Sequence, residues 1–263
     1  MIGTHQEAAK LRYARDGESG PSVVLIHELG GSLDSWDGVV KALEKDFRIL
    51  RYDMRGAGES ETPAKGFTLD DWIEDLRELL AATKLPQPYH LVGGAVGALI
   101  ATGYALKYPE QLASVTLLAA ALGASPARRE EMIARTKVVL EKGMAEITDA
   151  ALEKSYPPAV RHDPARFQRF RDTMLRANVQ GYVYCNLVLA NTNLEARLPE
   201  LKVPTQFIAG IHDPLRTPAI VSALAAKVPG AKYEAVDSGH FMHVQTPRLV
   251  ADKIRAFVTA HVK

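Results

Sequence analysis

Apolar residues in this chain fall into short continuous runs that alternate with longer amphipathic stretches. A continuous apolar run bounded by turn residues is typical of a strand that is covered on both faces. Such strands are predicted at residues 22–27, 47–52, 89–92, 114–119, 205–209 and 232–236. Helices are predicted at residues 96–108, 218–227 and 248–261, and in a stretch that Thr68 and Asp71 cap and that runs to about Ala82. This alternation predicts an α/β fold with a mostly parallel sheet and helices on both of its faces.

The strand signal disappears between residues 122 and 193. Four stretches there show helical spacing, with breaks at Gly143 and at Pro157-Pro158: residues 128–142, 144–154, 164–176 and 181–189. A continuation of the main layer would need strands, and none interrupts this span. We therefore predict an α/β core formed by residues 1–121 and 194–263, and a helical cap formed by residues 122–193 over the C-terminal edge of the sheet.

Composition and charge narrow the class of protein. Hydrophobic residues make up 47% of the 263 positions, without an apolar run long enough for a membrane span. The formal net charge of +1 gives no electrostatic reason to bind nucleic acid or an anionic membrane. A single cysteine, Cys185, excludes an internal disulfide, and the first residues lack the pattern of a signal peptide. We expect a cytoplasmic protein whose partner is a small molecule; the sequence does not determine its oligomeric state.

The junction between the strand at 89–92 and the helix at 96–108 is the most informative part of the sequence. Residues 90–99 are His-Leu-Val-Gly-Gly-Ala-Val-Gly-Ala-Leu, and a strand, a tight glycine turn and a helix form the context of the G-x-S-x-G nucleophile elbow. Gly93 and Gly97 occupy its glycine positions and permit the sharp turn that lifts the central residue to the top of the sheet. That central residue is Ala95. A methyl group cannot attack a carbonyl, so the sequence predicts a nucleophile site without its nucleophile.

Further motifs follow one another in a characteristic order along nearly the whole chain. They are His27-Glu28-Leu29-Gly30-Gly31, Arg51-Tyr52-Asp53-Met54-Arg55-Gly56, the elbow, Ala209-Gly210-Ile211-His212-Asp213 and Ser238-Gly239-His240. With these motifs the chain resembles the α/β-hydrolase superfamily, and within it the 3-oxoadipate enol-lactonase-like group, which has a helical cap. Two positions depart from the pattern: Ala95 stands at the place of a serine, and Glu28 at the place of a small residue.

The resemblance implies a triad whose members follow the order nucleophile, acid and histidine along the chain. It places the nucleophile position at Ala95, the acid at Asp213 and the base at His240. A carboxylate at position 213 can accept the Nδ1 proton of the histidine and fix its tautomer, although an aspartate here could also serve only to form a turn. The resemblance also places two oxyanion-hole donors at the backbone N–H groups of Leu29 and Val96.

Glu28 is a candidate for substrate binding or acid–base chemistry. A carboxylate beside an oxyanion hole would oppose the negative charge that develops there. We therefore expect Glu28 either to face solvent or form a salt bridge as a loop residue, or to act as an acid–base group with a raised pKa. His212 and His243 lie close to the motifs but out of register, and no chemistry is assigned to them.

Other chemistries find little support in the sequence. The segment Gly56-Ala57-Gly58 lacks the third glycine and the lysine of a phosphate-binding loop. The eight histidines do not show the spacing of metal ligands. We therefore predict neither a cofactor nor a metal.

Three functions stay open on the sequence alone. The first is a hydrolase of a small, carboxylated ester, lactone or cleavable ketone, in a form with a Ser-to-Ala change at position 95. The second is a cofactor-independent, non-covalent enzyme (a lyase, a decarboxylase or a water-activating hydrolase) that uses His240 and, in one version, Glu28. The third is a non-catalytic binder of small molecules. The presence of Asp213, His240 and both predicted hole positions counts against the third, because a binder has no need of that geometry.

Overall fold

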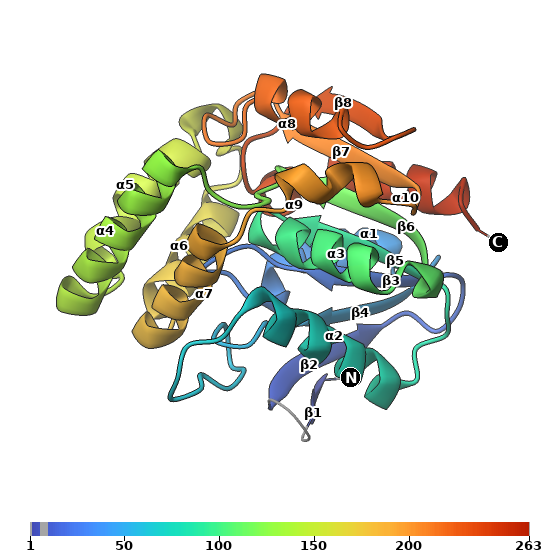
Figure 1. The fold of residues 1–263 in the computed structure, drawn as a ribbon, viewed down its shortest axis with the longest axis horizontal. Helices are drawn as coiled ribbons and strands as arrows, with labels where there is room; N and C mark the ends of the chain where they lie inside the picture. Colours follow the sequence, from blue (N-terminus) through green and yellow to red (C-terminus); the bar gives the residue numbers. More distant parts are fainter. Residues whose placement is uncertain (1, 6–9, 263) are drawn as a thin grey trace.

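The computed structural model describes residues 2–5 and 10–262; residues 1, 6–9 and 263 of the predicted core lie outside the described part. An eight-stranded sheet with the order β1-β2-β4-β3-β5-β6-β7-β8 runs through the molecule (Figure 1). Strands β1 and β2 are antiparallel to their neighbours, and the other adjacent pairs are parallel, which confirms the predicted mostly parallel α/β fold. The strands are β1 (Ile2–His5), β2 (Leu11–Asp16), β3 (Ser22–Ile26), β4 (Arg48–Tyr52), β5 (Tyr89–Gly94), β6 (Leu112–Leu118), β7 (Thr205–Gly210) and β8 (Lys232–Val236).

Helices cover both faces of this sheet. They are α1 (Asp37–Leu43), α2 (Leu69–Thr83), α3 (Val96–Lys107), α8 (Pro218–Ala225), α9 (Met242–Gln245) and α10 (Pro247–Thr259). Val24 and Ile26 of β3 pack in one apolar cluster with α2, α3 and α8, whereas Val23 and Leu25 pack in a second cluster with α1 and α10. Successive side chains of a strand point to opposite faces of the sheet. A strand covered on both faces therefore needs the continuous apolar run that the sequence shows.

Four further helices follow β6 and precede β7, within the span for which helices were predicted. They are α4 (Pro126–Lys142), α5 (Ala145–Ser155), α6 (Pro164–Arg176) and α7 (Val179–Asn191). Figure 1 shows them together on one side of the sheet, at the left of the view. An isolated antiparallel bridge between Gly123 and Asn193 joins the two ends of this helical segment where it leaves and rejoins the core.

The N-terminal strands, α1 and the short 3-10 helices were not predicted. Strand β2 mixes buried and half-buried positions and so lacks a continuous apolar run. The 3-10 helices are η1 (Leu33–Trp36), η2 (Pro109–Gln111), η3 (Pro158–Val160) and η4 (Glu195–Glu200). Each is too short for its hydrophobic period to stand out in the sequence.

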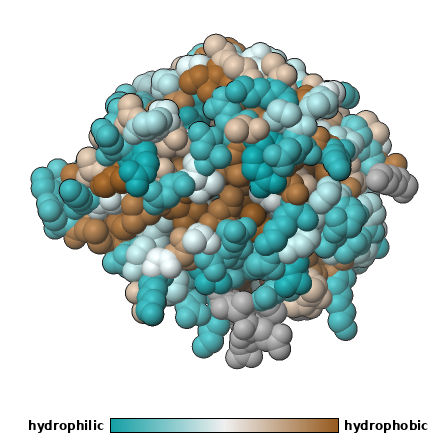
Figure 2. All heavy atoms as spheres, in the orientation of Figure 1, coloured by the Kyte–Doolittle hydropathy of each residue, from teal (hydrophilic) through white to brown (hydrophobic). Residues whose placement is uncertain are grey.

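The surface is mostly hydrophilic on the side shown in Figure 2, where one apolar band extends from the helical segment toward the centre of the view. Within residues 2–5 and 10–262, no helix combines the length and the apolar character needed to span a membrane.

The start of α3 packs directly against the backbone of β3. A Cβ atom on Gly97 would lie 2.3 Å from the carbonyl oxygen of Ile26 and 2.8 Å from that of His27. A Cβ atom on Gly93 would lie 2.4 Å from the carbonyl carbon of Gly97. Glycine is therefore required on both sides of the turn, because any side chain would push the helix away from the sheet.

We expect Gly97→Ala to lower the free energy of unfolding by about 1–3 kcal/mol, because overpacking against fixed backbone has a cost of this size. Equilibrium unfolding in urea measures the change. Gly66→Ala is the matched control, since its Cβ would meet nothing closer than the Tyr184 ring at 3.6 Å. Equal urea midpoints for the wild type and Gly97→Ala would refute the packing argument.

Candidate active site

Ala95 has the backbone conformation of an elbow residue. It lies between β5 and α3 with φ 50° and ψ −108°, and a non-glycine residue held in such a region costs about 1–3 kcal/mol. Two hydrogen bonds to the end of β6 and the residues after it hold Ala95 in this conformation. Its N–H donates to the Leu118 carbonyl at 2.9 Å, and its own carbonyl accepts from the Ala121 N–H at 3.2 Å. The turn that presents a nucleophile is thus complete around a methyl group.

Asp213 and His240 come together from the loops that follow β7 and β8. The His240 Nδ1 lies 2.8 Å from one oxygen of the buried Asp213 carboxylate. The other oxygen accepts the backbone N–H groups of Leu215 at 2.8 Å and Arg216 at 3.0 Å. Burial alone would raise the pKa of Asp213, but the facing imidazole and the two amides outweigh it and the pKa is lowered. An ionised Asp213 fixes the proton on Nδ1 and leaves Nε2 of His240 as a proton acceptor.

A cavity of about 620 Å³ separates this pair from the helical segment, and both Ala95 and His240 line it. Leu29 and Val96, whose amides are the predicted oxyanion donors, line the same cavity. Val96 is the first residue of α3, and the N–H groups of a first helical turn have no acceptor within the helix. The structure therefore brings four predicted site residues to one cavity, with Asp213 directly behind His240. The role of the two amides as an oxyanion hole stays a prediction.

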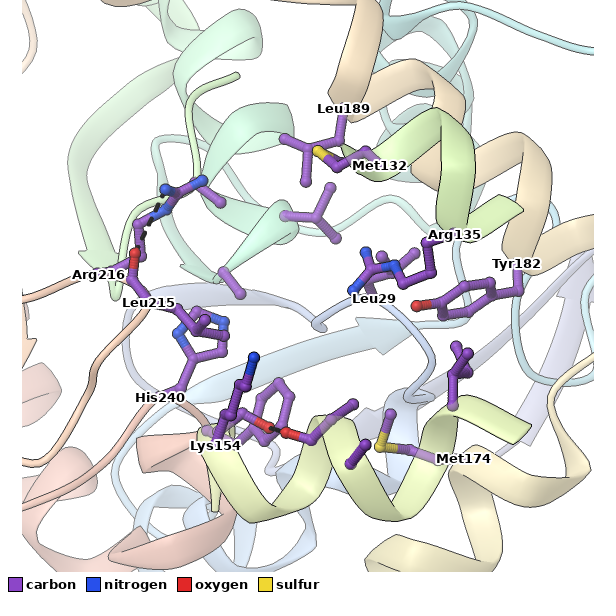
Figure 3. A pocket seen from close by; sticks show the side chains of 18 of the residues that line it. Leu29, Met132, Arg135, Lys154, Met174, Tyr182, Leu189, Leu215, Arg216 and His240 are labelled. Carbon is purple, nitrogen blue, oxygen red and sulfur yellow. Dashed lines mark hydrogen bonds between the residues drawn. The ribbon is translucent and has the colours of Figure 1, made fainter. Parts of the chain in front are cut away.

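Cations outnumber carboxylates in the cavity lining. The cations are Arg128, Arg135, Lys154 and Arg216, and the one carboxylate is that of Glu146. Glu146 has a cation of its own, because Lys142 Nζ lies 3.2 Å from its carboxylate. Figure 3 shows the side chains of Arg135, Lys154 and Arg216 around the cavity with His240. None of these four cations was predicted individually from the sequence. Arg128 and Arg135 lie two turns apart on one face of α4, so their spacing of seven residues in the sequence could have predicted that they share a face.

Glu28 is the salt-bridged loop residue among the predicted alternatives; it is buried, and it is absent from the cavity lining. Its side chain is fully buried, with one oxygen 2.6 Å from His243 Nε2 and the other accepting the Ser35 hydroxyl at 2.7 Å. Burial alone would raise the pKa of Glu28, but the charge and hydrogen bond of His243 and the hydroxyl of Ser35 lower it. The carboxylate is therefore an ion-pair partner behind the elbow, and its pKa moves opposite to that of a buried general acid.

Gly94, the residue before Ala95, makes room for this ion pair. A Cβ atom on Gly94 would lie 2.7 Å from His243 Cε1, so the imidazole occupies the space of a missing side chain. The ring also stacks on Trp36 with 4.3 Å between ring centroids. His243 thus has a structural place, whereas His212 pairs with Asp237 at 2.9 Å near the surface.

No group of three or more histidine, cysteine or acidic side chains in the described part of the chain is arranged to hold a metal ion. The residues that line the cavity offer cations and apolar surface, a set that suits an organic anion.

Comparison with known proteins agrees with this geometry. A family model described as alpha/beta hydrolase fold matches residues 21–247. The chain is 26% identical to 3-oxoadipate enol-lactonase 2 of Acinetobacter baylyi, in an alignment that covers 96% of this chain and 94% of that protein.

Two solved structures are similar over almost the whole fold. An enol-lactonase from Burkholderia xenovorans is 29% identical, with a TM-score of 0.88 and coverage of 95% of this chain and 97% of that one. A thermophilic esterase from Thermogutta terrifontis, solved with malate bound, is 25% identical, with a TM-score of 0.91 and coverage of 99% and 98%. The chain therefore belongs to the alpha/beta hydrolase fold family and is a hydrolase of the enol-lactonase type, with alanine at the position of the nucleophile.

Proposed function

We propose that this protein hydrolyses a small, carboxylated ester or lactone by direct attack of water, without a covalent enzyme intermediate. One observation carries the proposal: His240, paired with Asp213 at 2.8 Å, lines one cavity with an alanine at the apex of an intact elbow. The proton acceptor of a serine hydrolase is present, and the hydroxyl that it would activate is not. A water molecule beside the Ala95 methyl takes the place of that hydroxyl.

The reaction follows from this arrangement. His240 Nε2 accepts a proton from water as the water oxygen attacks the carbonyl carbon. The N–H groups of Leu29 and Val96 stabilise the oxyanion that forms, and Asp213 stabilises the imidazolium. When the tetrahedral intermediate collapses, the carbon–oxygen bond to the leaving group breaks and the leaving oxygen takes the proton from His240. The products are a carboxylic acid and an alcohol or enol. When the substrate is a lactone, both groups belong to the same product molecule.

The charge of the cavity supports a carboxylated substrate. Three of its four lining cations, Arg135, Lys154 and Arg216, form no ion pair with a carboxylate in the described part of the chain. Guanidinium groups recognise carboxylates through paired N–H donors. Related proteins of the same fold are enol-lactonases, and the esterase from Thermogutta terrifontis binds malate, a small organic anion.

We expect His240→Ala to reduce turnover of a carboxylated ester by about 10²–10⁴-fold, because a positioned general base contributes rate enhancement of this size. Hydrolysis of the 4-nitrophenyl monoester of glutaric acid, followed at 400 nm, is a convenient assay. His212→Ala is the matched control, since that imidazole pairs with Asp237 away from the cavity. Equal turnover by the wild type and His240→Ala would remove His240 from the mechanism and favour a binding protein.

We expect Ala95→Ser to gain covalent reactivity, because the elbow, His240 and Asp213 are already in place for a hydroxyl. The variant should be labelled by a fluorophosphonate and should show a burst of nitrophenol release. The double variant Ala95→Ser/His240→Ala should show neither. A folded Ala95→Ser protein that takes no label would show that the geometry around residue 95 does not activate a nucleophile.

We expect Glu28→Gln to lower the free energy of unfolding at pH 7 by about 3–5 kcal/mol, because removing one partner of a buried, hydrogen-bonded carboxylate–imidazole pair has a cost of this size. The pKa of Glu28 is lowered in the folded state, so its contribution is complete above the pKa of the unfolded carboxyl and is lost as pH falls through the folded value. The difference between the two proteins should therefore shrink in acid.

Urea unfolding of the wild type and Glu28→Gln, first at pH 7 and then at pH 4 and below, measures how the difference in unfolding free energy changes with pH. Glu153→Gln is the control: Glu153 pairs with Arg161 at the surface and is 65% exposed, so its loss should cost at most about 1 kcal/mol. A stability difference that stays constant down to pH 3 would contradict the ion-pair account. A loss of kcat by several orders of magnitude in folded Glu28→Gln would return Glu28 to the acid–base chemistry.

A further inference from the structure

Two arginines of the cavity carry buried N–H groups without an acceptor. The Nε atoms of Arg135 and Arg216 are buried, and no described residue accepts a hydrogen bond from either. Leaving a buried donor of a charged group unpaired is costly, and native structures seldom do so without a reason. Both arginines are among the residues that line the cavity, and Arg216 also lines a smaller neighbouring pocket with Gly123; a ligand in the cavity can supply an acceptor to each.

Arg135 is held in position by neutral groups. It lies on α4, and its Nη2 donates to Asn186 Oδ1 of α7 at 2.7 Å. Its guanidinium carbon lies 6.0 Å from the centre of the Tyr182 ring, within the range of a cation–π contact. These contacts orient the guanidinium without neutralising it, so its charge remains available to an anion.

Arg216 is held even more loosely. Its guanidinium reaches two backbone carbonyls, those of Leu215 and Gly123, each at 3.5 Å. Its pKa is lowered by burial and then by the positive charge of Arg128. Arg128 has an ion-pair partner, Glu131 at 2.6 Å, whereas Arg216 has only Asp213 nearby, and the oxygens of Asp213 are bound to His240 and to backbone amides.

The two guanidinium groups are well separated. Figure 3 shows Arg216 on one side of the cavity, with His240, and Arg135 on the other side, with Tyr182 and Leu29. Each guanidinium has its own buried Nε–H without an acceptor, so each needs an acceptor on its own side of the cavity. The carboxylate of Glu146, which also lines the cavity, is bound by Lys142 at 3.2 Å, so it does not pair with either arginine.

We propose that the cavity binds a ligand with two anionic groups, one held by Arg216 and the other by Arg135. This inference rests on the proposed function only for the position of the reacting carbonyl, which lies between the two anions near His240 and Leu29. The substrate class is therefore an ester or lactone with one anionic group on its acyl part and a second on its alkoxy part, so that one anion lies on each side of the scissile bond. Fixing both ends positions the carbonyl before water attacks, which is a main source of rate enhancement.

Isothermal titration calorimetry with the wild-type protein tests the proposal without any turnover. The probes are succinate, glutarate, adipate and pimelate, each compared with the monocarboxylate of equal carbon number. We expect one dicarboxylate to bind at least about tenfold more tightly than its monocarboxylate, because a second charge-assisted contact contributes at least this factor. Equal affinities across all four pairs would overturn the proposal.

Single variants assign the two ends. Arg135→Met and Arg216→Met keep an apolar stem, and each should reduce the affinity for the preferred dicarboxylate to about that of the monocarboxylate. Arg129→Met is the matched control: Arg129 is on the same helix and donates to Asn191 of α7 at 3.0 Å, but it does not line the cavity. Full dicarboxylate preference in either of the first two variants would overturn the proposal.

Thermal unfolding shows whether each variant is folded. Where a methionine variant fails to fold, the lysine variant replaces it, since lysine keeps the charge but loses the paired donors; an undiminished preference there would also overturn the proposal. The two proposals can fail separately. If the protein prefers dicarboxylates but His240→Ala leaves turnover unchanged, only the hydrolytic mechanism is refuted. If His240→Ala reduces turnover but the protein shows no preference for dicarboxylates, only the dianion site is refuted.

Discussion

The backbone turn at Ala95 is the constraint on which the rest of the site depends. Gly93 and Gly97 let α3 start against the carbonyl groups of β3, and hydrogen bonds on both sides hold residue 95 at φ 50° and ψ −108°. This strain would be relieved if α3 moved away from the sheet, but the amide of Val96 and the cavity wall would move with it. The protein thus maintains a costly conformation whose usual purpose is to present a side chain, although the side chain here is a methyl group.

In the proposed mechanism this conformation leaves room for a water molecule beside His240 and keeps Val96 at the same cavity. Behind it, the Glu28–His243 ion pair occupies the space that a side chain at Gly94 would need. This pair connects the loop after β3, which carries Leu29, with α9, which begins two residues after His240. The Glu28 carboxylate is therefore bound by His243 and Ser35 and is absent from the cavity lining.

Much of this arrangement could be predicted from the sequence. The apolar runs and glycine turns indicated the strands, the elbow and the helical segment, and the order of the motifs indicated Asp213 and His240, which the structure places 2.8 Å apart. Glu28 could not be assigned in this way, because its burial depends on His243, a residue 215 positions later in the chain. The cations of the cavity were missed for a similar reason: Arg135 and Arg216 come from separate elements, and only the packing of α4 over the sheet brings them to one cavity.

Intact-protein mass spectrometry of samples quenched in acid during turnover tests the central claim most directly. With the 4-nitrophenyl monoester of glutaric acid as substrate, direct attack by water predicts that the mass of the wild-type chain stays unchanged at every time point. Ala95→Ser, under the same conditions, should gain the mass of a glutaryl group. Turnover by the wild-type chain accompanied by a glutaryl adduct on any of its residues would contradict the account, because it would show that the protein uses a nucleophile after all.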